Sequence, residues 1–143
     1  SSDLHRLHLL MRGVPILALL LLAGAAQAAE PACGDFLEQL GVASPGLHFE
    51  GCKLEEGGQL RQLVAEYQVP GPQAHGVESL LQQRFGLQPL RFICCGWDTP
   101  PASAPHASGR PYEIRMSSGE TLEKDWARID RFYVSVTLYL EDP

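Results

Sequence analysis

Residues 132–140, FYVSVTLYL, alternate apolar side chains with polar or amphipathic ones along the whole segment. Because successive side chains of a strand point to opposite faces, this period of two predicts a strand with one buried face. The predicted buried row is Phe132, Val134, Val136, Leu138 and Leu140. The outward row, Tyr133, Ser135, Thr137 and Tyr139, is expected either to face solvent or to form a recognition surface.

Four segments upstream of this strand also have strand patterns. Residues 47–52 and 60–69 alternate and are separated by the turn residues Glu55-Glu56-Gly57-Gly58, which predicts an antiparallel hairpin. Residues 90–97 are almost continuously apolar, which is typical of a central strand that is buried on both faces. Residues 112–116 are predicted to form the strand before the last one.

Two segments have the spacing of amphipathic helices. Residues 35–40 form the shorter one, and residues 73–85 form the longer one, which Gly86 is expected to end as a C-cap. The apolar stripe of the longer helix consists of Val77, Leu80, Leu81 and Phe85. Residues 122–129 are predicted to add a further turn or two of helix.

Residues 99–111 contain four of the eleven prolines, together with Ala, Ser and Gly. This composition predicts a mobile surface loop that is dispensable for folding. The predicted element order is then helix, strand, strand, helix, strand, strand, strand. This order indicates a single α+β domain in residues 29–143, with a mostly antiparallel sheet of about five strands and two helices on one face.

Residues 11–28 have the three parts of a cleavable signal peptide. Arg12 gives a positive start, residues 14–22 are an apolar run, and Ala26-Gln27-Ala28 is a small-x-small cleavage site. We therefore expect a periplasmic or secreted protein that begins at residue 29 and has no stable membrane insertion after cleavage. Residues 1–10 precede a plausible start methionine and are interpreted as upstream sequence or a cloning remnant.

The exported part of the chain is acidic. The whole chain has a formal net charge of −6, and residues 29–143 carry 9 basic against 16 acidic side chains, a formal charge of −7. Because phosphate binding needs clustered Lys and Arg, this charge argues against nucleic acid as a partner. Solubility explains the acidity most simply, and basic proteins, peptides or cations stay open as partners.

All four cysteines lie in the exported part, so we expect a disulfide-stapled domain. Joining the neighbours Cys94 and Cys95 would require a strained eight-membered ring, which disfavours that pairing. Strand parity puts Cys94 on the core side, which the helix after Cys33 covers, and puts Cys95 on the side of Cys52. We therefore prefer Cys33–Cys94 with Cys52–Cys95, although a single bulge would reverse this choice.

The sequence contains no catalytic motif. Thiol-redox catalysis generally uses Cys-x-x-Cys at a helix N-terminus, and four-thiolate zinc sites use paired Cys-x-x-Cys knuckles; both spacings are absent. The chain also lacks a nucleophile elbow, a His-Glu-x-x-His helix, a phosphate loop and an EF-hand. We expect no catalytic residues, no metal and no cofactor, and we favour a protein that is not an enzyme.

Aromatic residues are the best candidates for binding a partner. Trp97 and Asp98 lie where the strand at residues 90–97 ends, and an indole at such a position can anchor a partner because it buries a large area. Trp126, Tyr133 and Tyr139 are the other candidates. The alternative interpretation is that Trp97 packs over a disulfide and Trp126 covers the core.

Four segments together carry a family resemblance. They are Cys33-Gly34-Asp35-Phe36-Leu37, Phe49-x-x-Cys52, Leu90-Arg91-Phe92-Ile93-Cys94-Cys95-Gly96-Trp97 and residues 132–136. The Cys-Cys-Gly-Trp motif is the most specific part. These segments resemble a family of small exported bacterial proteins known only as a domain of unknown function, which implies a shared fold and an exported location but no activity.

The leading functional expectation is a non-enzymatic interaction protein of the cell envelope, such as an inhibitor or immunity-type binding module. Its partner would be a protein that the sequence does not identify. The alternative is a small exported hydrolase or thiol-redox enzyme whose site spans several strands and leaves no linear motif.

Overall fold

The computed structural model describes residue 24 and residues 29–143 of the chain. The predicted upstream segment, residues 1–10, and the predicted signal peptide, residues 11–28, lie outside the described residues apart from Gly24. The elements in chain order are α1 (Phe36–Gln39), β1 (His48–Glu55), β2 (Gln62–Pro70), α2 (Gly71–Phe85), β3 (Arg91–Ile93), β4 (Gly96–Asp98), β5 (Ala102–Ala104), β6 (Tyr112–Ser117), the 3-10 helix η1 (Trp126–Arg128) and β7 (Arg131–Tyr139). None of the helices described is long and apolar enough to cross a membrane.

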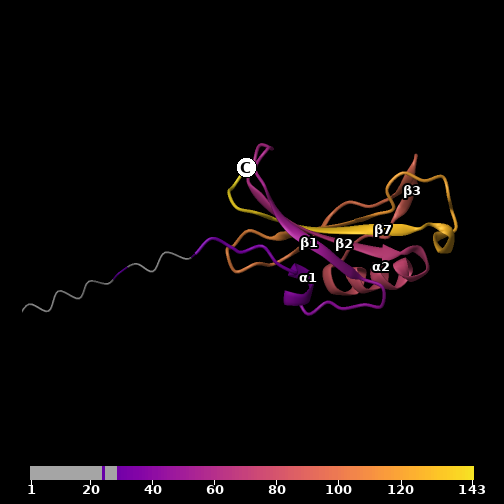
Figure 1. The fold of residues 1–143 in the computed structure, drawn as a ribbon, viewed down its shortest axis with the longest axis horizontal. Coiled ribbons are helices and arrows are strands. Elements are labelled where there is room, and N and C mark those ends of the chain that lie inside the picture. The colour runs from indigo at the N-terminus through magenta and orange to yellow at the C-terminus, as the bar shows by residue number, and fades with distance from the viewer. Residues whose placement is uncertain (1–23, 25–28) are drawn as a thin grey trace, which may run out of the picture.

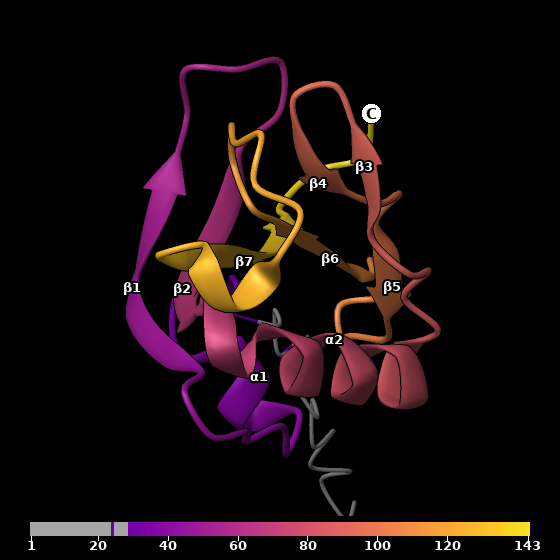
Figure 2. The same cartoon turned by 90° about the vertical axis from the view of Figure 1, so that its right-hand side faces the viewer.

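Five of the strands form one antiparallel sheet in the order β1-β2-β7-β6-β5 (Figure 2). The strand predicted from the alternation at residues 132–140 is confirmed as β7, and Phe132, Val134, Val136 and Leu138 are buried. β7 is also the central strand of the sheet, between β2 and β6. Its inner face therefore lies over the middle of the core, which explains why its alternation is the clearest in the chain.

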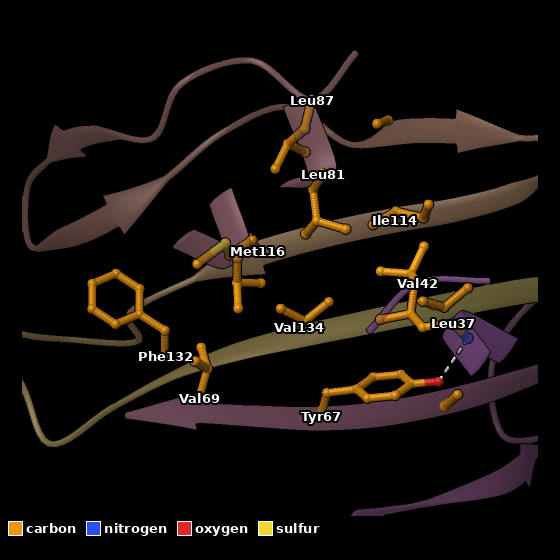
Figure 3. Close-up of a cluster of buried hydrophobic side chains, with 14 of the residues drawn as sticks. Leu37, Val42, Tyr67, Val69, Leu81, Leu87, Ile114, Met116, Phe132 and Val134 are labelled. Carbon is orange, nitrogen blue, oxygen red and sulfur yellow. Dashed lines mark hydrogen bonds between the residues drawn. The ribbon is translucent and has the colours of Figure 1, made fainter. Parts of the chain in front are cut away.

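The helices α1 and α2 lie on the same side of the sheet, below the strands in Figure 1. Leu81 and Leu87, on the helix side, face Met116 and Val134 of the sheet (Figure 3). α2 ends at Gly86 in the left-handed conformation, as predicted. The α+β architecture with two helices on one face of a mostly antiparallel sheet is therefore confirmed.

The helix α2 begins two residues earlier than the sequence pattern predicts, at Gly71. Prolines fit the first turn of a helix because the amide hydrogen that they lack has no partner there, and Pro72 lies in that turn. A side chain at Gly71 would place its Cβ 2.0 Å from the carbonyl oxygen of Ile129. Only glycine lets the helix start this close to the segment before β7.

The prediction of a central strand at residues 90–97 is wrong. β3 and β4 form a separate two-stranded sheet, with Cys94 and Cys95 in the turn between them. The apolar residues of this segment serve different surfaces: Leu90 is buried in the core, whereas Ile93 is exposed. The continuous apolar pattern thus comes from a docked hairpin and not from a strand that is buried on both faces.

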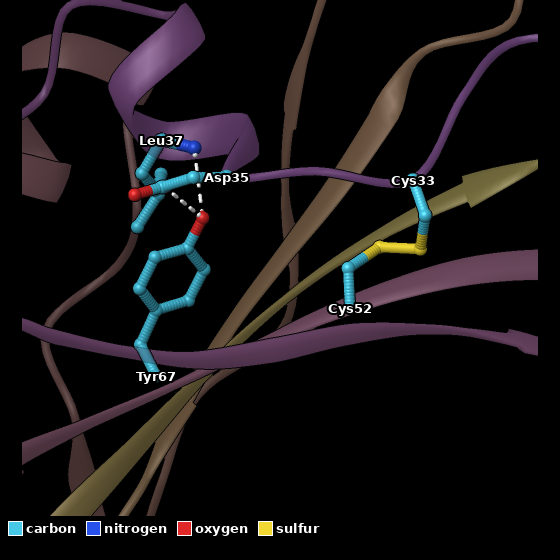
Figure 4. Close-up of a disulfide and its surroundings, with 5 residues drawn as sticks. All are labelled: Cys33, Asp35, Leu37, Cys52 and Tyr67. Atoms are coloured by element: carbon cyan, nitrogen blue, oxygen red, sulfur yellow. Dashed lines mark hydrogen bonds between the residues drawn. A yellow bond between two sulfur atoms is a disulfide. The ribbon is translucent and has the colours of Figure 1, made fainter.

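The disulfide pairing that we prefer from strand parity is also wrong. The bridges are Cys33–Cys52 and Cys94–Cys95. The parity argument fails because Cys94 and Cys95 belong to the hairpin turn and not to a strand of the main sheet. Cys33 instead reaches Cys52 on β1 and ties the segment before α1 to the sheet (Figure 4).

Residues 99–111 are not a loop throughout. Ala102–Ala104 forms β5, which pairs with β6 at the edge of the main sheet. Both Ala102 and Ala104 are buried, so part of this segment belongs to the core. The predicted helical turn within residues 122–129 is present as η1.

Candidate functional site

Aromatic packing connects the β3–β4 hairpin to the core. The ring of Trp97 meets Phe92 edge-on at 5.7 Å and Trp126 at 5.4 Å between centroids. Trp126 in turn packs against Phe132 of β7 at 4.5 Å and is only 5% exposed. The base of the hairpin is therefore an extension of the hydrophobic core.

Hydrogen bonds fix the same hairpin to residues 118–123. The Trp97 amide donates to Ser118 Oγ at 2.8 Å, and the Ser118 amide donates back to the Trp97 carbonyl at 3.0 Å. The indole Nε1 of Trp97 donates to the Glu123 carbonyl at 3.0 Å, and the Thr121 amide donates to the Cys95 carbonyl at 2.8 Å. Two of these bonds join backbone groups and two involve a side chain, and together they hold the hairpin in one position.

Glycine makes this close approach possible. A Cβ at position 96 would lie 2.3 Å from the carbonyl oxygen of Gly119, a distance at which atoms collide. Gly96 also forms an isolated antiparallel bridge with Glu120. The Cys-Cys-Gly-Trp motif thus combines a turn, a residue without a side chain at the contact and an aromatic anchor.

The far end of the hairpin presents apolar groups to solvent. Ile93 is 60% exposed, and Cys94 and Cys95 are both exposed. Leu122 follows Thr121, whose amide binds the Cys95 carbonyl, and it is 76% exposed. We call these four residues, Ile93, Cys94, Cys95 and Leu122, the hairpin tip; β3 rises above the sheet, opposite the helices, in Figure 1.

A hollow of about 280 Å³ lies beside the hairpin tip. Its walls include both cysteines of the turn, Trp97 and the exposed acidic residues Asp98 and Glu120. Two carboxylates thus border this side of the tip, while the basic Arg91 lies opposite Asp98 in the hairpin and Lys124 Nζ lies 3.0 Å from the centroid of the Phe92 ring. Among the described residues, no group of three His, Cys, Asp or Glu side chains could hold a metal ion.

The structure places the predicted partner-binding residues in two regions. Trp97, Asp98 and Trp126 lie at the base of the hairpin, where Trp97 is half-buried and Asp98 accepts a hydrogen bond from the Thr99 amide at 2.8 Å. Tyr133 and Tyr139 lie on the sheet face away from the helices. Tyr133 is 44% exposed, and its ring lies close to Gly119, beside the segment that holds the hairpin.

The sheet face that the helices leave uncovered is polar. It carries a groove of about 560 Å³ lined by Gly46, His48, Glu50, Gln68, Val69, Pro70, Asp130 and Arg131. Arg131 contacts Asp130 at 2.7 Å and donates to Gln68 Oε1 at 3.1 Å. Its guanidinium is therefore already engaged within the protein, and the groove offers fewer free groups than its composition indicates.

Tyr67 anchors the other end of the domain (Figure 4). Its hydroxyl donates to Asp35 Oδ1 at 2.6 Å and accepts from the buried Leu37 amide at 3.0 Å. Burial and the hydrogen bond to Asp35 both raise the pKa of the Tyr67 hydroxyl. A phenol that keeps its proton so firmly holds α1 against the sheet and is a poor general base.

The histidines make local or packing contacts. The His75 ring stacks on Trp126 at 3.7 Å between centroids. His106 Nδ1 lies 2.8 Å from Ser108 Oγ, but both side chains belong to one turn and Ser108 also accepts from the Arg110 amide. This arrangement closes a loop and lacks the third residue that would orient a catalytic histidine.

Sequence reasoning missed the exposed part of the hairpin. Ile93 was hidden in an apolar run that predicted burial, and Leu122 was assigned only to a turn or two of helix together with Trp126. The available signal was the pair of adjacent cysteines followed by Gly96, since a disulfide between neighbours requires a turn and glycine permits a close contact.

Comparison with known families gives one match. Residues 23–97, just over half of the chain, match a domain of unknown function (DUF4952). The matched segment ends at Trp97 and so contains both disulfides and the whole Cys-Cys-Gly-Trp motif. No curated protein and no solved structure matches the chain.

Proposed function

The chain belongs to this family of domains of unknown function, and we propose that it is a non-enzymatic interaction protein of the cell envelope that binds a protein partner through the hairpin tip. The observation that carries the proposal is the exposure of Ile93 on the hairpin and of Leu122 on the segment that hydrogen-bonds to it, while the base of the hairpin is fixed to the core. Large apolar side chains that a fixed, projecting element holds in water can bind a partner, because the contact removes their apolar area from water.

The rigidity of the hairpin favours binding. Backbone hydrogen bonds and the contact between Trp97 and Trp126 order the hairpin before any partner arrives. A surface that is already ordered loses little conformational entropy on association, so more of its contact energy remains as affinity. In this proposal Trp97 supports the contact surface from behind, and the tip residues make the contact.

The composition of the surface indicates the chemistry of the partner. Ile93 and Leu122 would fill an apolar recess, while Asp98 and Glu120 at the border would face basic side chains. Apolar contacts at the centre and charges at the rim are the usual division of an interface. The partner is thus an envelope protein with an apolar recess and a basic rim, which fits an inhibitor or immunity-type role.

The proposed location rests on the signal peptide predicted at residues 11–28 and on the cysteines. Disulfides persist in oxidising compartments such as the bacterial periplasm and are rare in the cytosol. All four cysteines of the chain are paired, which supports a periplasmic or secreted protein.

Site-specific photo-crosslinking tests the proposal. A photoreactive phenylalanine analogue would replace Ile93 or Leu122 in the expressed full chain, and Gln83, exposed on α2, would serve as the matched control position. We expect positions 93 and 122 to give the same discrete adduct in the envelope and position 83 to give none. Absence of an adduct at both tip positions, or the same adduct at position 83, would contradict the proposal.

A further inference from the structure

We infer that the Cys94–Cys95 disulfide is a thiol-exchange site that accepts two electrons from an exported dithiol. This inference does not depend on the proposed partner contact, because it concerns the covalent chemistry of the two cysteines. Three observations carry it: the short loop that the bridge closes, the contacts that hold the hairpin without it and the exposure of both cysteines.

The Cys94–Cys95 bridge contributes little to the stability of the fold. In the chain-entropy description, a disulfide stabilises a protein by restricting its unfolded chain, and the effect grows with the length of the closed loop. Cys94 and Cys95 are neighbours, whereas Cys33 and Cys52 are 19 residues apart. The Cys94–Cys95 bridge therefore restricts the unfolded chain very little, and stabilisation of the fold does not explain why it is present.

The hairpin keeps its position through contacts that do not involve the sulfur atoms. Ser118 and Trp97 exchange two hydrogen bonds, and the Thr121 amide binds the Cys95 carbonyl. The aromatic ring of Trp97 also packs on Trp126. Opening the disulfide removes none of these contacts, so the protein can be reduced at this site and stay folded.

Both sulfur-bearing residues can be reached from solvent. Cys94 and Cys95 are exposed, and they line the hollow of about 280 Å³ beside the hairpin tip. Exchange requires a thiolate to approach one sulfur of the bridge, so access decides which disulfides react. Exposed disulfides are reduced more readily than enclosed ones. The other bridge is exposed at Cys33 and half-buried at Cys52, so access is greater at the hairpin turn, and the short closed loop is the main difference between the two bridges.

The exchange takes place in two balanced steps. A thiolate of the dithiol attacks one sulfur of the bridge, a new S–S bond forms with that cysteine, and the Cys94–Cys95 bond breaks with its electron pair on the other cysteine, which takes a proton from water. The second thiolate of the dithiol then attacks the dithiol's own sulfur in the mixed disulfide, and the first cysteine leaves with the electron pair and takes a proton from water. The dithiol leaves as a disulfide, and Cys94 and Cys95 are left as two thiols.

Reductant titration tests the site in the mature protein. The protein would be incubated with increasing dithiothreitol, quenched with acid, alkylated and mapped by mass spectrometry. We expect Cys94 and Cys95 to become alkylated together at a dithiothreitol concentration roughly tenfold below that which opens Cys33–Cys52. Opening of Cys33–Cys52 first, or of both bridges together, would overturn the inference.

A trapping experiment gives an independent readout. The probe is a reduced thiol oxidoreductase that keeps its attacking cysteine and has serine in place of its resolving cysteine. Without the resolving cysteine the mixed disulfide is not released, so it accumulates. We expect a covalent adduct at Cys94 or Cys95 in the wild type, and none in the Cys94→Ser/Cys95→Ser variant, whose fold is checked by circular dichroism. An adduct at Cys33 or Cys52, or no adduct with the wild type, would rule the exchange site out.

Discussion

The Cys33–Cys52 disulfide joins the segment before α1 to the edge strand β1, whereas the Cys94–Cys95 disulfide joins two neighbours in a hairpin turn. The Cys33–Cys52 bridge closes a long loop next to the hydrogen bonds of Tyr67. The Cys94–Cys95 bridge closes almost no loop and lies on an exposed, projecting turn. The comparison shows that the role of a disulfide depends on what it holds together and on what can reach it. We therefore propose a stabilising role for the Cys33–Cys52 bridge and thiol exchange for the Cys94–Cys95 bridge.

Removing each bridge in turn gives the largest expected difference between the two regions. Cys33→Ser/Cys52→Ser should lower the free energy of unfolding by about 3 kcal/mol, because the unfolded chain regains the freedom of a long loop. The matched variant Cys94→Ser/Cys95→Ser should lower it by about 1 kcal/mol or less. Urea unfolding of both variants measures the difference, and equal losses would remove the distinction between staple and exposed site.

The base and the tip of the hairpin should respond differently to substitution. Trp97→Ala should cost about 2 kcal/mol of stability, because it removes a half-buried indole and its hydrogen bond to the Glu123 carbonyl. Ile93→Ser should change stability by less than about 0.5 kcal/mol, because that side chain faces solvent. If Trp97→Ala left the melting temperature unchanged, the hairpin would not be anchored as described.

Tyr67→Phe tests the anchor near the Cys33–Cys52 end. The change keeps the ring but leaves the buried Leu37 amide without its acceptor, so we expect a loss of roughly 1–2 kcal/mol. The matched control is Tyr133→Phe, at an exposed hydroxyl, which should have almost no effect on the free energy of unfolding. Losses of similar size in the two variants would show that the Tyr67 hydroxyl does not secure α1.

Alkaline pH should weaken the same anchor by a smaller amount. The pKa of Tyr67 is raised above its ordinary value of 10.0, so the folded protein keeps this proton at a pH where the unfolded chain releases it. The stability that the protonated hydroxyl contributes is complete below pH 10 and falls progressively as the pH rises from that value towards the raised pKa of the folded protein. Between neutral pH and about pH 11, the free energy of unfolding should fall more steeply for the wild type than for Tyr67→Phe. Parallel curves would contradict the shift.

Burial also raises the pKa of Tyr112, so some alkaline loss should persist in the Tyr67→Phe variant. The difference between the two curves is therefore the informative quantity, and not the absolute slope of either one.

Local patterns predicted four of the five strands of the main sheet, namely β1, β2, β6 and β7. The alternation of β7 and the apolar stripe of α2 both follow from contact with a single core, so each can be found in a short window of sequence. The prediction for residues 90–97 was wrong because a continuous apolar run has the same sequence pattern in a buried central strand and in a hairpin that packs on the core with one side. The strand β5 was not predicted because its three residues lie between prolines and are too few to show an alternating pattern.

The contact surface that we propose belongs to the same hairpin as the predicted one, but it consists of different side chains. The sequence indicates Trp97 as a candidate partner-binding residue, and the structure shows that its ring connects the hairpin to Trp126. Exposure of Ile93 and Leu122 depends on the direction in which the hairpin leaves the core, which is a tertiary property. A contribution of Trp97 to partner binding stays a prediction, and partner capture by the folded fraction of the Trp97→Ala variant tests it.

The central claim is that one disulfide lies wholly in the hairpin turn and the other ties the chain to β1, and non-reducing peptide mapping tests it most directly. Trypsin leaves Cys33 and Cys52 in the peptide that ends at Lys53, and leaves Cys94 and Cys95 in the peptide that begins at Phe92. The account predicts two separate peptides, each lighter by two hydrogens than its reduced form. A single species in which these two peptides are covalently joined would contradict it.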